Sequence, residues 1–174
     1  KPDYFEAYCN KGVTLYELLR YNDALIVYDQ ALSIEPNYAQ AHYNKGVTLQ
    51  ALRLYEEAAS CHLRAIDINA EYADAHLALG ILHLRMNDFA SGWEAHEWRW
   101  KASNSNSVQY LTSKPLWDGQ KTEKRILVWP EQGVGDKILY SSMFEEVRLL
   151  SPKMIVLMDG RLISAYKRSF PHVE

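Results

Sequence analysis

One candidate for proton transfer in this sequence is an aspartate that follows a glycine-bearing turn. The run EQGVGD, residues 131–136, ends in Asp136 and is separated from the apolar segment 126–129 by Pro130 alone. Gly133 and Gly135 permit a tight turn and a close approach of the backbone to a ligand. An aspartate at the mouth of such a crevice could act as a general base. The alternative interpretation is structural, with Asp136 as the N-cap of the helix that begins there.

Two phosphate-binding motifs do not fit this turn. It reads G-x-G-x-x-I, so it lacks the third glycine of a dinucleotide-binding fingerprint. It also lacks the Gly-Lys-Ser/Thr sequence of a P-loop. The turn is therefore not interpreted as a phosphate cradle.

A second candidate chemistry is peptide recognition by side-chain amides. Asn10 and Asn44 lie 34 residues apart, and Ala78 stands at the next equivalent position. Each amide offers a hydrogen-bond donor and an acceptor. A row of amides can pair with the backbone of an extended peptide, whatever the peptide's sequence. The alternative is that both asparagines only stabilise local structure.

The residues that carry these amides belong to an internal repeat of 34 residues. Segment 5–38 aligns without a gap with segment 39–72, and a third unit occupies 73–103. Each unit divides into two segments with helical spacing around a short polar break. Small residues let the two helices approach closely, and stacked hairpins bury the faces that a single hairpin cannot. The recurring positions are Ala7, Ala41 and Ala75; Gly12, Gly46 and Gly80; Tyr21, Tyr55 and Phe89; Ala24 and Ala58; Ala31 and Ala65.

The period and these positions closely resemble the tetratricopeptide repeat over residues 2–103. The resemblance implies an αα-hairpin solenoid of three repeats with a concave groove that binds a protein or peptide. Pro36 matches the family's closing proline and Ala70 departs from it. Residues 2–4 match 36–38, so we expect further repeats upstream. Helix geometry turns the following residues toward the groove: Glu6, Cys9, Asn10, Val13, Glu17, Gln40, Tyr43, Asn44, Val47, Gln50, Asp74, Leu77, Ala78 and Ile81. The paired asparagines resemble the ladder in the repeats of O-GlcNAc transferase.

The third unit departs from the pattern. Gly92 replaces the alanine at positions 24 and 58, and Arg99 replaces the alanine at positions 31 and 65. Trp93, His96 and Trp100 have the spacing of one helical face. Large side chains cannot fill a hole made for alanine, so we expect this helix to meet the rest of the chain or another subunit. The residues assigned to packing between domains are Trp93, Trp98, Arg99, Trp100 and Trp117.

Beyond the repeats, residues 104–124 read as an irregular connection. A strand at 126–129, a helix at 136–150, a strand at 154–159 and a helix at 161–170 then predict a parallel sheet with a right-handed crossover. We interpret 125–174 as an incomplete Rossmann-like unit, which makes the chain mainly α with a partial α/β part. Its open sheet edge, or a repeat surface, favours a homo-oligomer.

Taken together, GWEAHEWRW, KPLWDG and ILVWPEQGVGD resemble bacterial repeat proteins with a glycosyltransferase-like domain of the GT-B, heptosyltransferase type. The resemblance implies that Asp136 is the catalytic base of an inverting, metal-independent transfer. It places Glu131, Gln132, Gly133 and Gly135 in the loop beside the acceptor. The parent protein would use a nucleotide sugar, which such enzymes bind mainly in a second Rossmann domain. We therefore expect residues 1–174 alone to hold no cofactor and to be inactive. The alternatives are a scaffold without catalysis and a nucleotide binder that is not a transferase.

Composition narrows the remaining classes. The net charge of −3 argues against a generic nucleic-acid binder, and no apolar run approaches the length of a membrane span. Cys9 and Cys61 are far apart and lack metal-ligand spacing, which favours a reducing, cytoplasmic setting. The repeat-equivalent histidines lie about one repeat apart, so we expect interface or surface residues and no metal site.

Overall fold

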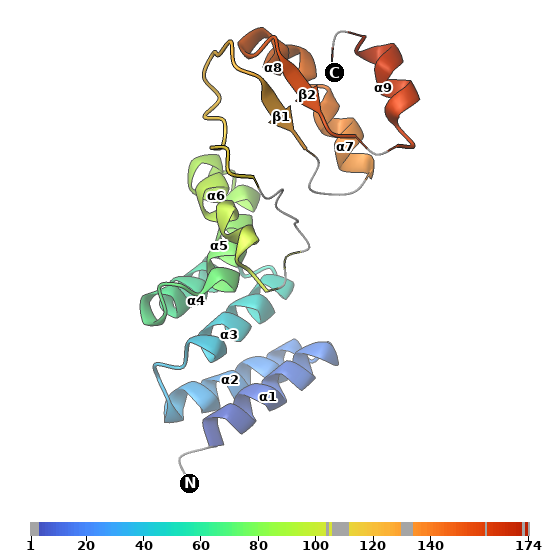
Figure 1. Cartoon of the computed structure of the whole chain (residues 1–174). Helices are drawn as coiled ribbons and strands as arrows, with labels where there is room; N and C mark the ends of the chain where they lie inside the picture. Colours follow the sequence, from blue (N-terminus) through green and yellow to red (C-terminus); the bar gives the residue numbers. More distant parts are fainter. Residues whose placement is uncertain are drawn as a thin grey trace. The chain divides into compact units, whose positions relative to one another are not determined.

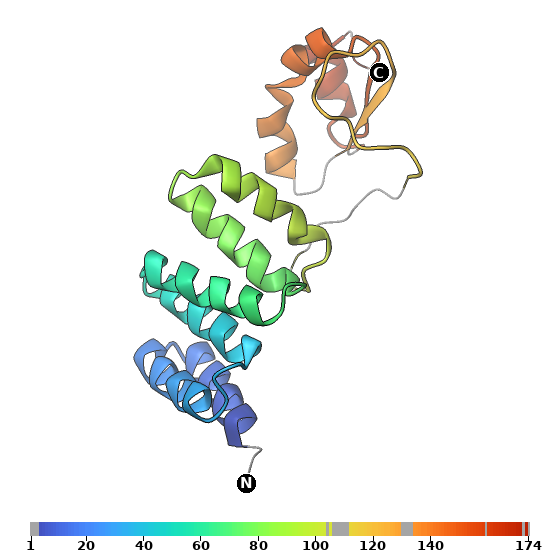
Figure 2. The same ribbon diagram turned by 90° about the vertical axis from the view of Figure 1, so that its left-hand side faces the viewer.

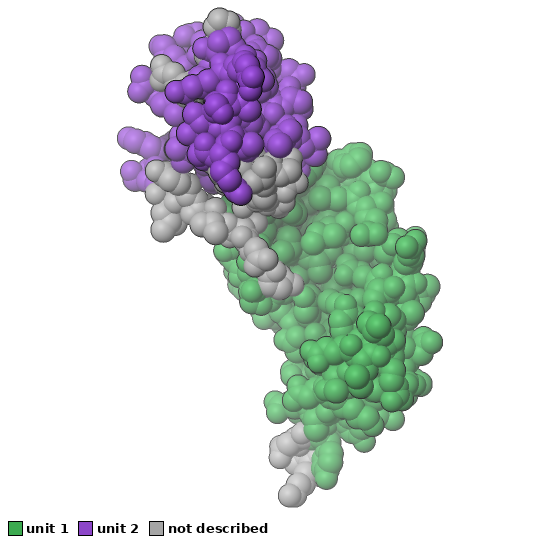
Figure 3. Space-filling view, turned by 90° about the vertical axis from the view of Figure 1, so that its right-hand side faces the viewer, with its two compact units in different colours: residues 1–105 green, residues 106–174 purple. Residues whose placement is uncertain are grey.

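The computed structural model describes residues 4–103, 105, 112–129, 134–158, 160–171 and 173, with the backbone alone described at 134–137. The chain forms two compact units, which are described separately below (Figures 1 and 3). Unit 1 comprises residues 1–105 and unit 2 comprises residues 106–174.

Unit 1 is a solenoid of stacked helical hairpins (Figures 1 and 2). Each hairpin packs its two helices together, and the second helix of one hairpin packs on the first helix of the next. The hairpins are α1 (Tyr4–Glu17) with α2 (Tyr21–Ile34), α3 (Ala39–Ala51) with α4 (Tyr55–Ile68), and α5 (Ala73–Arg85) with α6 (Phe89–His96), which the 3-10 helix η1 (Glu97–Trp100) follows.

The first helix of each hairpin ends in the same way. Leu19, Arg53 and Asn87 have φ angles of 60°, 63° and 64°, in the left-handed region. The amide of the next residue bonds back over five positions, as in Arg20 N–H to the Leu15 carbonyl at 2.9 Å. This is the Schellman arrangement, usually built on glycine. The 34-residue period therefore repeats a backbone conformation as well as a side-chain pattern.

Small residues hold each hairpin tight, as the sequence predicts. A Cβ atom on Gly12 would lie 2.4 Å from Cε1 of Tyr28, and one on Gly46 would lie 2.6 Å from Cε1 of His62. Only glycine allows these helices to approach so closely. The alanines between helices are fully buried: Ala24, Ala31, Ala41, Ala58, Ala65 and Ala75.

Unit 2 contains a two-stranded parallel sheet. Strand β1 (Ile126–Val128) pairs with β2 (Met154–Val156) in the register Ile126–Met154, Leu127–Ile155 and Val128–Val156. Its buried core consists of Ile126, Phe144 and Met154, and Phe170 packs on Phe144 with ring centroids 5.4 Å apart. Its helices are α7 (Val134–Ser141), α8 (Phe144–Leu150) and α9 (Ile163–Ser169).

The prediction of one helix over 136–150 is wrong. The chain forms α7 and α8, which are separated at residues 142 and 143. The hydroxyl of Ser141 donates to the Ile138 carbonyl at 2.6 Å, and that of Ser142 donates to the Leu139 carbonyl at 2.8 Å. Serine hydroxyls that bond the preceding turn compete with the backbone ladder, which accounts for the break. Both strands are also shorter than predicted, because they end at Val128 and Val156.

Within the described ranges, no helix combines the length and apolarity that crossing a membrane requires.

Candidate functional site

The predicted groove residues lie on the first helices of the three hairpins, a surface called here the α1–α3–α5 face. Hydrogen bonds link these helices directly. Asn44 Nδ2 donates to Cys9 Sγ at 3.4 Å, which joins α3 to α1. Gln50 Nε2 donates to the Ala78 carbonyl at 3.4 Å, which joins α3 to α5. The structure thus brings groove residues of all three repeats together on one surface.

A relay of hydrogen bonds crosses this face. The Tyr72 hydroxyl donates to Gln40 Oε1 at 2.7 Å, and Gln40 Nε2 donates to Asn44 Oδ1 at 3.1 Å. The Asn44 contact with Cys9 completes the relay. Burial raises the pKa of the Cys9 thiol, although the hydrogen bond from Asn44 opposes this, and burial also raises the pKa of the Tyr72 phenol. Every member of the relay is therefore uncharged at neutral pH.

The two asparagines of the predicted ladder have different surroundings. Asn44 is partly buried and bonded on both sides of its amide. Asn10 is exposed, and its side chain bonds to no other residue in the described part of the chain. Glu6 is exposed as well, at the start of α1. Asn10 and Glu6 are thus free to meet a ligand, whereas Asn44 must exchange a partner first.

Tyr43 does not simply line the groove. Its ring centroid lies 5.6 Å from that of His62 and 5.2 Å from that of Tyr72, so it packs against α4 and the turn that leads into α5. Asp74, another predicted groove residue, accepts hydrogen bonds from the amide and the hydroxyl of Ser103, both at 2.8 Å. The segment after η1 therefore folds back onto the start of α5.

Trp98 also packs on the third repeat. Its ring stacks on His76 with centroids 3.9 Å apart and planes 4° apart. The Lys101 ammonium lies 4.5 Å from the Trp98 ring centroid and pairs with Glu71 at 3.3 Å. These contacts hold the end of unit 1 against α5.

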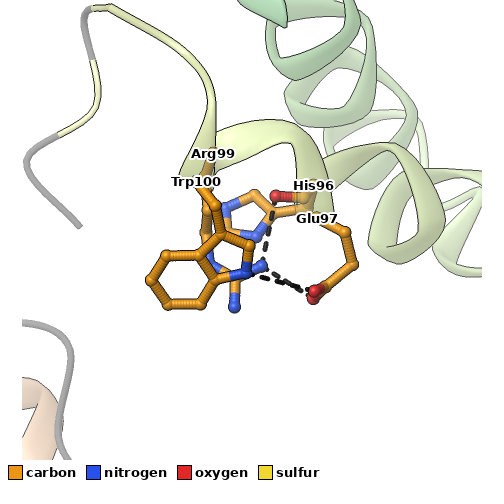
Figure 4. Close-up of polar contacts among 4 residues, drawn as sticks. All are labelled: His96, Glu97, Arg99 and Trp100. Carbon is orange, nitrogen blue, oxygen red and sulfur yellow. Dashed lines mark hydrogen bonds and ion pairs between the residues drawn. The ribbon is translucent and has the colours of Figure 1, made fainter. Parts of the chain in front are cut away.

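A compact cluster surrounds Arg99 (Figure 4). Arg99 NH1 donates to Glu97 Oε1 at 2.7 Å and to the His96 carbonyl at 3.2 Å, while its Cζ lies 4.0 Å from the Trp100 ring centroid. Trp100 Nε1 donates to Glu97 Oε2 at 3.2 Å. Burial raises the pKa of Glu97, but bonding and charge from Arg99, with the Trp100 bond, outweigh it and leave that pKa lowered.

The expected face of Trp93, His96 and Trp100 is interrupted. Because α6 ends at His96 and η1 follows, Trp100 leaves the α-helical phase. Trp93 is 56% exposed and meets His96 edge to face. In unit 2, Trp117 Nε1 donates to the Gln120 carbonyl at 2.8 Å, and its ring packs on the core of that unit. The role of these residues between domains stays a prediction.

The glycine turn is only partly described. Glu131, Gln132 and Gly133 lie outside the described residues. Helix α7 begins at Val134, so Asp136 is its third residue rather than the residue before it, and the N-cap interpretation is wrong. Gly135 lies in the same first turn, and the Asp136 side chain is not described. Its role as a base stays a prediction.

His62 shows what sequence reasoning missed. We expected an interface or surface residue, yet the side chain is fully buried and neither ring nitrogen has a hydrogen-bond partner among the described residues. Burial lowers its pKa to about 4. The signal was available in the repeat, because His62 stands one period after Tyr28, a core ring.

The described ranges contain no group of three or more histidine, cysteine, aspartate or glutamate side chains that could hold a metal ion. His42 and His76 instead contact the carbonyls of Pro36 and Ala70, at 3.0 and 2.9 Å.

Comparison with known proteins supports the repeat assignment. Two tetratricopeptide repeat models match residues 5–38 and 27–59. Protein FlbA of Caulobacter vibrioides is 30% identical over 95 residues, which cover 52% of this chain and 16% of FlbA. The chain therefore corresponds to about one sixth of this curated relative.

Two solved structures resemble the repeats. The Sgt2 TPR domain of Aspergillus fumigatus is 26% identical with a TM-score of 0.53, and the match covers 55% of this chain and 64% of that domain. The second TPR of Spaghetti (RPAP3), bound to the HSP90 peptide SRMEEVD, is 16% identical with a TM-score of 0.54, covering 56% and 90%. The latter likeness shows the fold alone. Tetratricopeptide repeats are accordingly confirmed within unit 1, where the models match residues 5–59.

Proposed function

We propose that the α1–α3–α5 face binds an extended peptide segment of a protein partner. The observation that carries this proposal is the relay from Tyr72 through Gln40 and Asn44 to Cys9. It sets uncharged donors and acceptors from α1 through α3 to Tyr72, the residue that precedes α5. A solved repeat domain with the same fold is bound to an HSP90 peptide, so this fold is compatible with peptide binding.

The relay suits backbone recognition because amides can exchange partners. Asn10 offers a free donor and a free acceptor at the exposed end of this face. Gln40 and Asn44 bond to each other in the free protein, so a peptide replaces one existing bond with another. Each such exchange contributes about 1 kcal/mol or less, so several must act together. Affinity would then depend on the length of the peptide more than on any one contact.

The test is peptide binding by Asn10→Ala and by the double variant Asn10→Ala with Asn44→Ala. Fluorescence anisotropy with labelled SRMEEVD gives the affinity. We expect the single change to weaken binding several-fold and the double change by about ten-fold or more. Asn37→Ala is the matched control, because it removes an exposed amide outside this face and should leave the affinity unchanged.

Unchanged affinity in the double variant would refute the proposal. The single variant Asn10→Ala controls for a folding defect in the double variant. Asn10 is exposed and its amide bonds to no other described side chain, so this change should leave folding intact.

We also propose that unit 2 begins a glycosyltransferase-like domain of a longer parent protein. The parallel pairing of β1 with β2 across α7 and α8 supports this, because ligands of such sheets bind beyond the carboxyl ends of the strands. In the parent, Asp136 would take the proton of an acceptor hydroxyl, and a nucleotide sugar would be the donor. A scaffold without catalysis fits the same fold.

Turnover by the parent protein separates these two functions. If Asp136 is the base, Asp136→Asn should lower the transfer rate by about two to four powers of ten with folding intact. Residues 1–174 alone should not turn over a nucleotide sugar. Full activity of Asp136→Asn would exclude the role of Asp136 as the base. A parent protein that transfers no sugar would favour the alternative function, a scaffold without catalysis.

A further inference from the structure

One side of α1, the helix at the end of the stack of hairpins, is exposed at positions that are buried in the following repeats (Figures 1 and 2). Ala7 is exposed, whereas its equivalents Ala41 and Ala75 are fully buried. Thr14 is also exposed, whereas its equivalent Thr48 is fully buried. The later positions are covered because each first helix packs on the second helix of the preceding hairpin, as α3 packs on α2. The exposed residues on this side of α1, called here the α1 outer side, are Ala7, Lys11, Thr14 and Leu18.

The α1 outer side has the sequence of a helix face whose partner the structure shows. The run NKGVTL occurs at residues 10–15 in α1 and again at residues 44–49 in α3. The sequence ahead of the helix corresponds too, because residues 2–4 (PDY) stand one period before residues 36–38 (PNY). The residues that dock α3 on α2 are therefore present in α1 as well.

The first polar contact of the α2–α3 joint is an ion pair. Lys45 Nζ lies 2.6 Å from Asp29 Oδ1. The equivalent residue Lys11 is exposed and forms no ion pair with any described residue. An exposed ion pair contributes little to stability, but it disfavours a like charge opposite and so influences which helix docks. A helix that docks on α1 in the same way should therefore place an acid opposite Lys11.

The second polar contact joins a tyrosine to a threonine. The Tyr28 hydroxyl bonds with Thr48, whose own hydroxyl donates to the Asn44 carbonyl at 2.9 Å. The Thr14 hydroxyl makes the same bond to the Asn10 carbonyl at 3.1 Å. Because its proton is engaged in this way, the hydroxyl oxygen of Thr14 can accept a bond from a further donor. A tyrosine on a docked helix would supply that donor.

The joint between α4 and α5 shows that both sides of a joint change together. In α5, Leu79 and Leu82 replace the lysine and the threonine. In α4, His62 and Leu63 replace the tyrosine and the acid. The polar helix α3 thus follows Tyr-Asp, and the apolar helix α5 follows His-Leu. Because α1 carries the same polar residues as α3, it should follow a helix like α2.

We propose that the α1 outer side docks the second helix of a preceding repeat in the parent chain, and that this helix presents a tyrosine to Thr14 and an acid to Lys11. The tyrosine and the acid are adjacent, as Tyr28 and Asp29 are, and an alanine follows three residues after the tyrosine, as Ala31 does. The groove residues of α1 lie on a neighbouring stripe of the helix, so this joint is independent of peptide binding.

Thiol labelling tests whether the α1 outer side is covered in the parent protein. In residues 1–174, Ala7→Cys should react with a maleimide as an exposed cysteine does. In the parent protein the same cysteine should react about ten-fold more slowly or less, because labelling then requires local opening of the joint. Gln30→Cys is the matched control, since that position is exposed on α2 and should react equally in both proteins. Labelling of Cys9 and Cys61 in the unsubstituted chain is subtracted.

A chain with one added repeat tests the chemistry of the joint. A second copy of residues 5–38 is inserted after Tyr4, so that Asp29 of the copy comes opposite Lys11 of the original repeat. The added helix should slow the labelling of Ala7→Cys in the original repeat, as the parent protein does. Asp29→Lys in the copy should speed the labelling several-fold, and a further change of Lys11→Asp should slow it again.

The control for added charge is Gln30→Lys in the copy, which changes an exposed residue beside the ion pair and should leave the labelling slow. Equal labelling of Ala7→Cys in the parent protein and in residues 1–174 would overturn the inference, even if the added repeat slows it. Labelling of residues 1–174 that slows as the protein concentration rises would identify a second copy as the occupant and would also overturn it. Slow labelling in the parent that Lys11→Asp leaves unchanged would reject the acidic partner.

Discussion

The first two hairpins place a ring against a glycine at equivalent positions, but only one of these rings has a polar partner. Tyr28 faces Gly12 and His62 faces Gly46, and both rings are buried. The Tyr28 hydroxyl bonds with Thr48, which belongs to the next hairpin. The residue one period after Thr48 is the apolar Leu82, and the His62 nitrogens have no partner among the described residues.

This difference teaches that the repeat fixes packing more strictly than polarity. The glycine determines how closely the helices approach, so the facing position must carry a ring of limited size. Whether the polar atoms of that ring are satisfied depends on the following repeat. Burial raises the pKa of Tyr28 and lowers that of His62 to about 4, which leaves both rings uncharged at neutral pH. Of the two rings, only the histidine gains a charge when the folded protein is acidified, and it does so below about pH 4.

Acidification should destabilise unit 1 through His62, the largest effect expected here. The unfolded ring binds a proton below pH 6.5 and the folded ring only below about 4, so the unfolded state binds more protons in this window. Stability is fully present above pH 6.5 and falls as the pH drops, by about 3 kcal/mol in all. Urea unfolding followed by helical circular dichroism at pH 7 and pH 4 measures the loss.

The variant His62→Phe isolates this contribution from the titrating carboxylates. It should lose about 3 kcal/mol less than the natural protein over the same pH range. Tyr28→Phe is the matched control, because it changes the equivalent ring and leaves His62 in place. The same pH dependence in the natural protein and in His62→Phe would contradict this explanation.

Adding a methyl group at the two glycines should sharpen the comparison. In Gly12→Ala the new Cβ meets a tyrosine ring tethered by Thr48, so we expect about 2 kcal/mol of destabilisation. In Gly46→Ala it meets a smaller ring without a tether, so about 1 kcal/mol is expected. Chemical denaturation at pH 7 measures both. A cost at Gly46 equal to or above that at Gly12 would show that the tether is unimportant.

Removing the partner of Tyr28 should have the smallest effect. Thr48→Val leaves the buried phenol without its bond and should cost about 1 kcal/mol. Thr14 is the equivalent residue of the first repeat; its hydroxyl also bonds a carbonyl four residues back, but it is exposed. Thr14→Val should therefore change the unfolding free energy by less than about 0.5 kcal/mol. If the two changes lowered the unfolding free energy equally, the effect would come from the hydroxyl-to-carbonyl bond that both threonines make, and not from the contact of Thr48 with Tyr28.

Much of unit 1 could be predicted because its period repeats the same contacts. The buried alanines and the close glycine contacts follow from the alignment of 5–38 with 39–72. The ends of the first helices were harder to predict from the sequence, because Leu19 and Arg53 adopt a left-handed backbone conformation that glycine usually occupies. The burial of His62 was not predicted, because its environment was inferred from the residue type rather than from its position in the repeat.

Unit 2 was harder to predict because it has no repeat to compare. Ser141 and Ser142 divide a segment whose apolar spacing favours one continuous helix. The candidate site shows the same limit: spacing identified Asn10 and Asn44 as equivalent, but their different surroundings depend on Cys9 and Gln40.

The most direct test of the central claim is to follow side-chain amide signals by nuclear magnetic resonance while SRMEEVD is added to residues 1–174. The proposed function predicts saturable shifts of the Asn10, Gln40 and Asn44 signals, with those of Asn37 and Asn69 unmoved. Shifts confined to amides outside the α1–α3–α5 face, or none at a peptide concentration that saturates anisotropy, would contradict it.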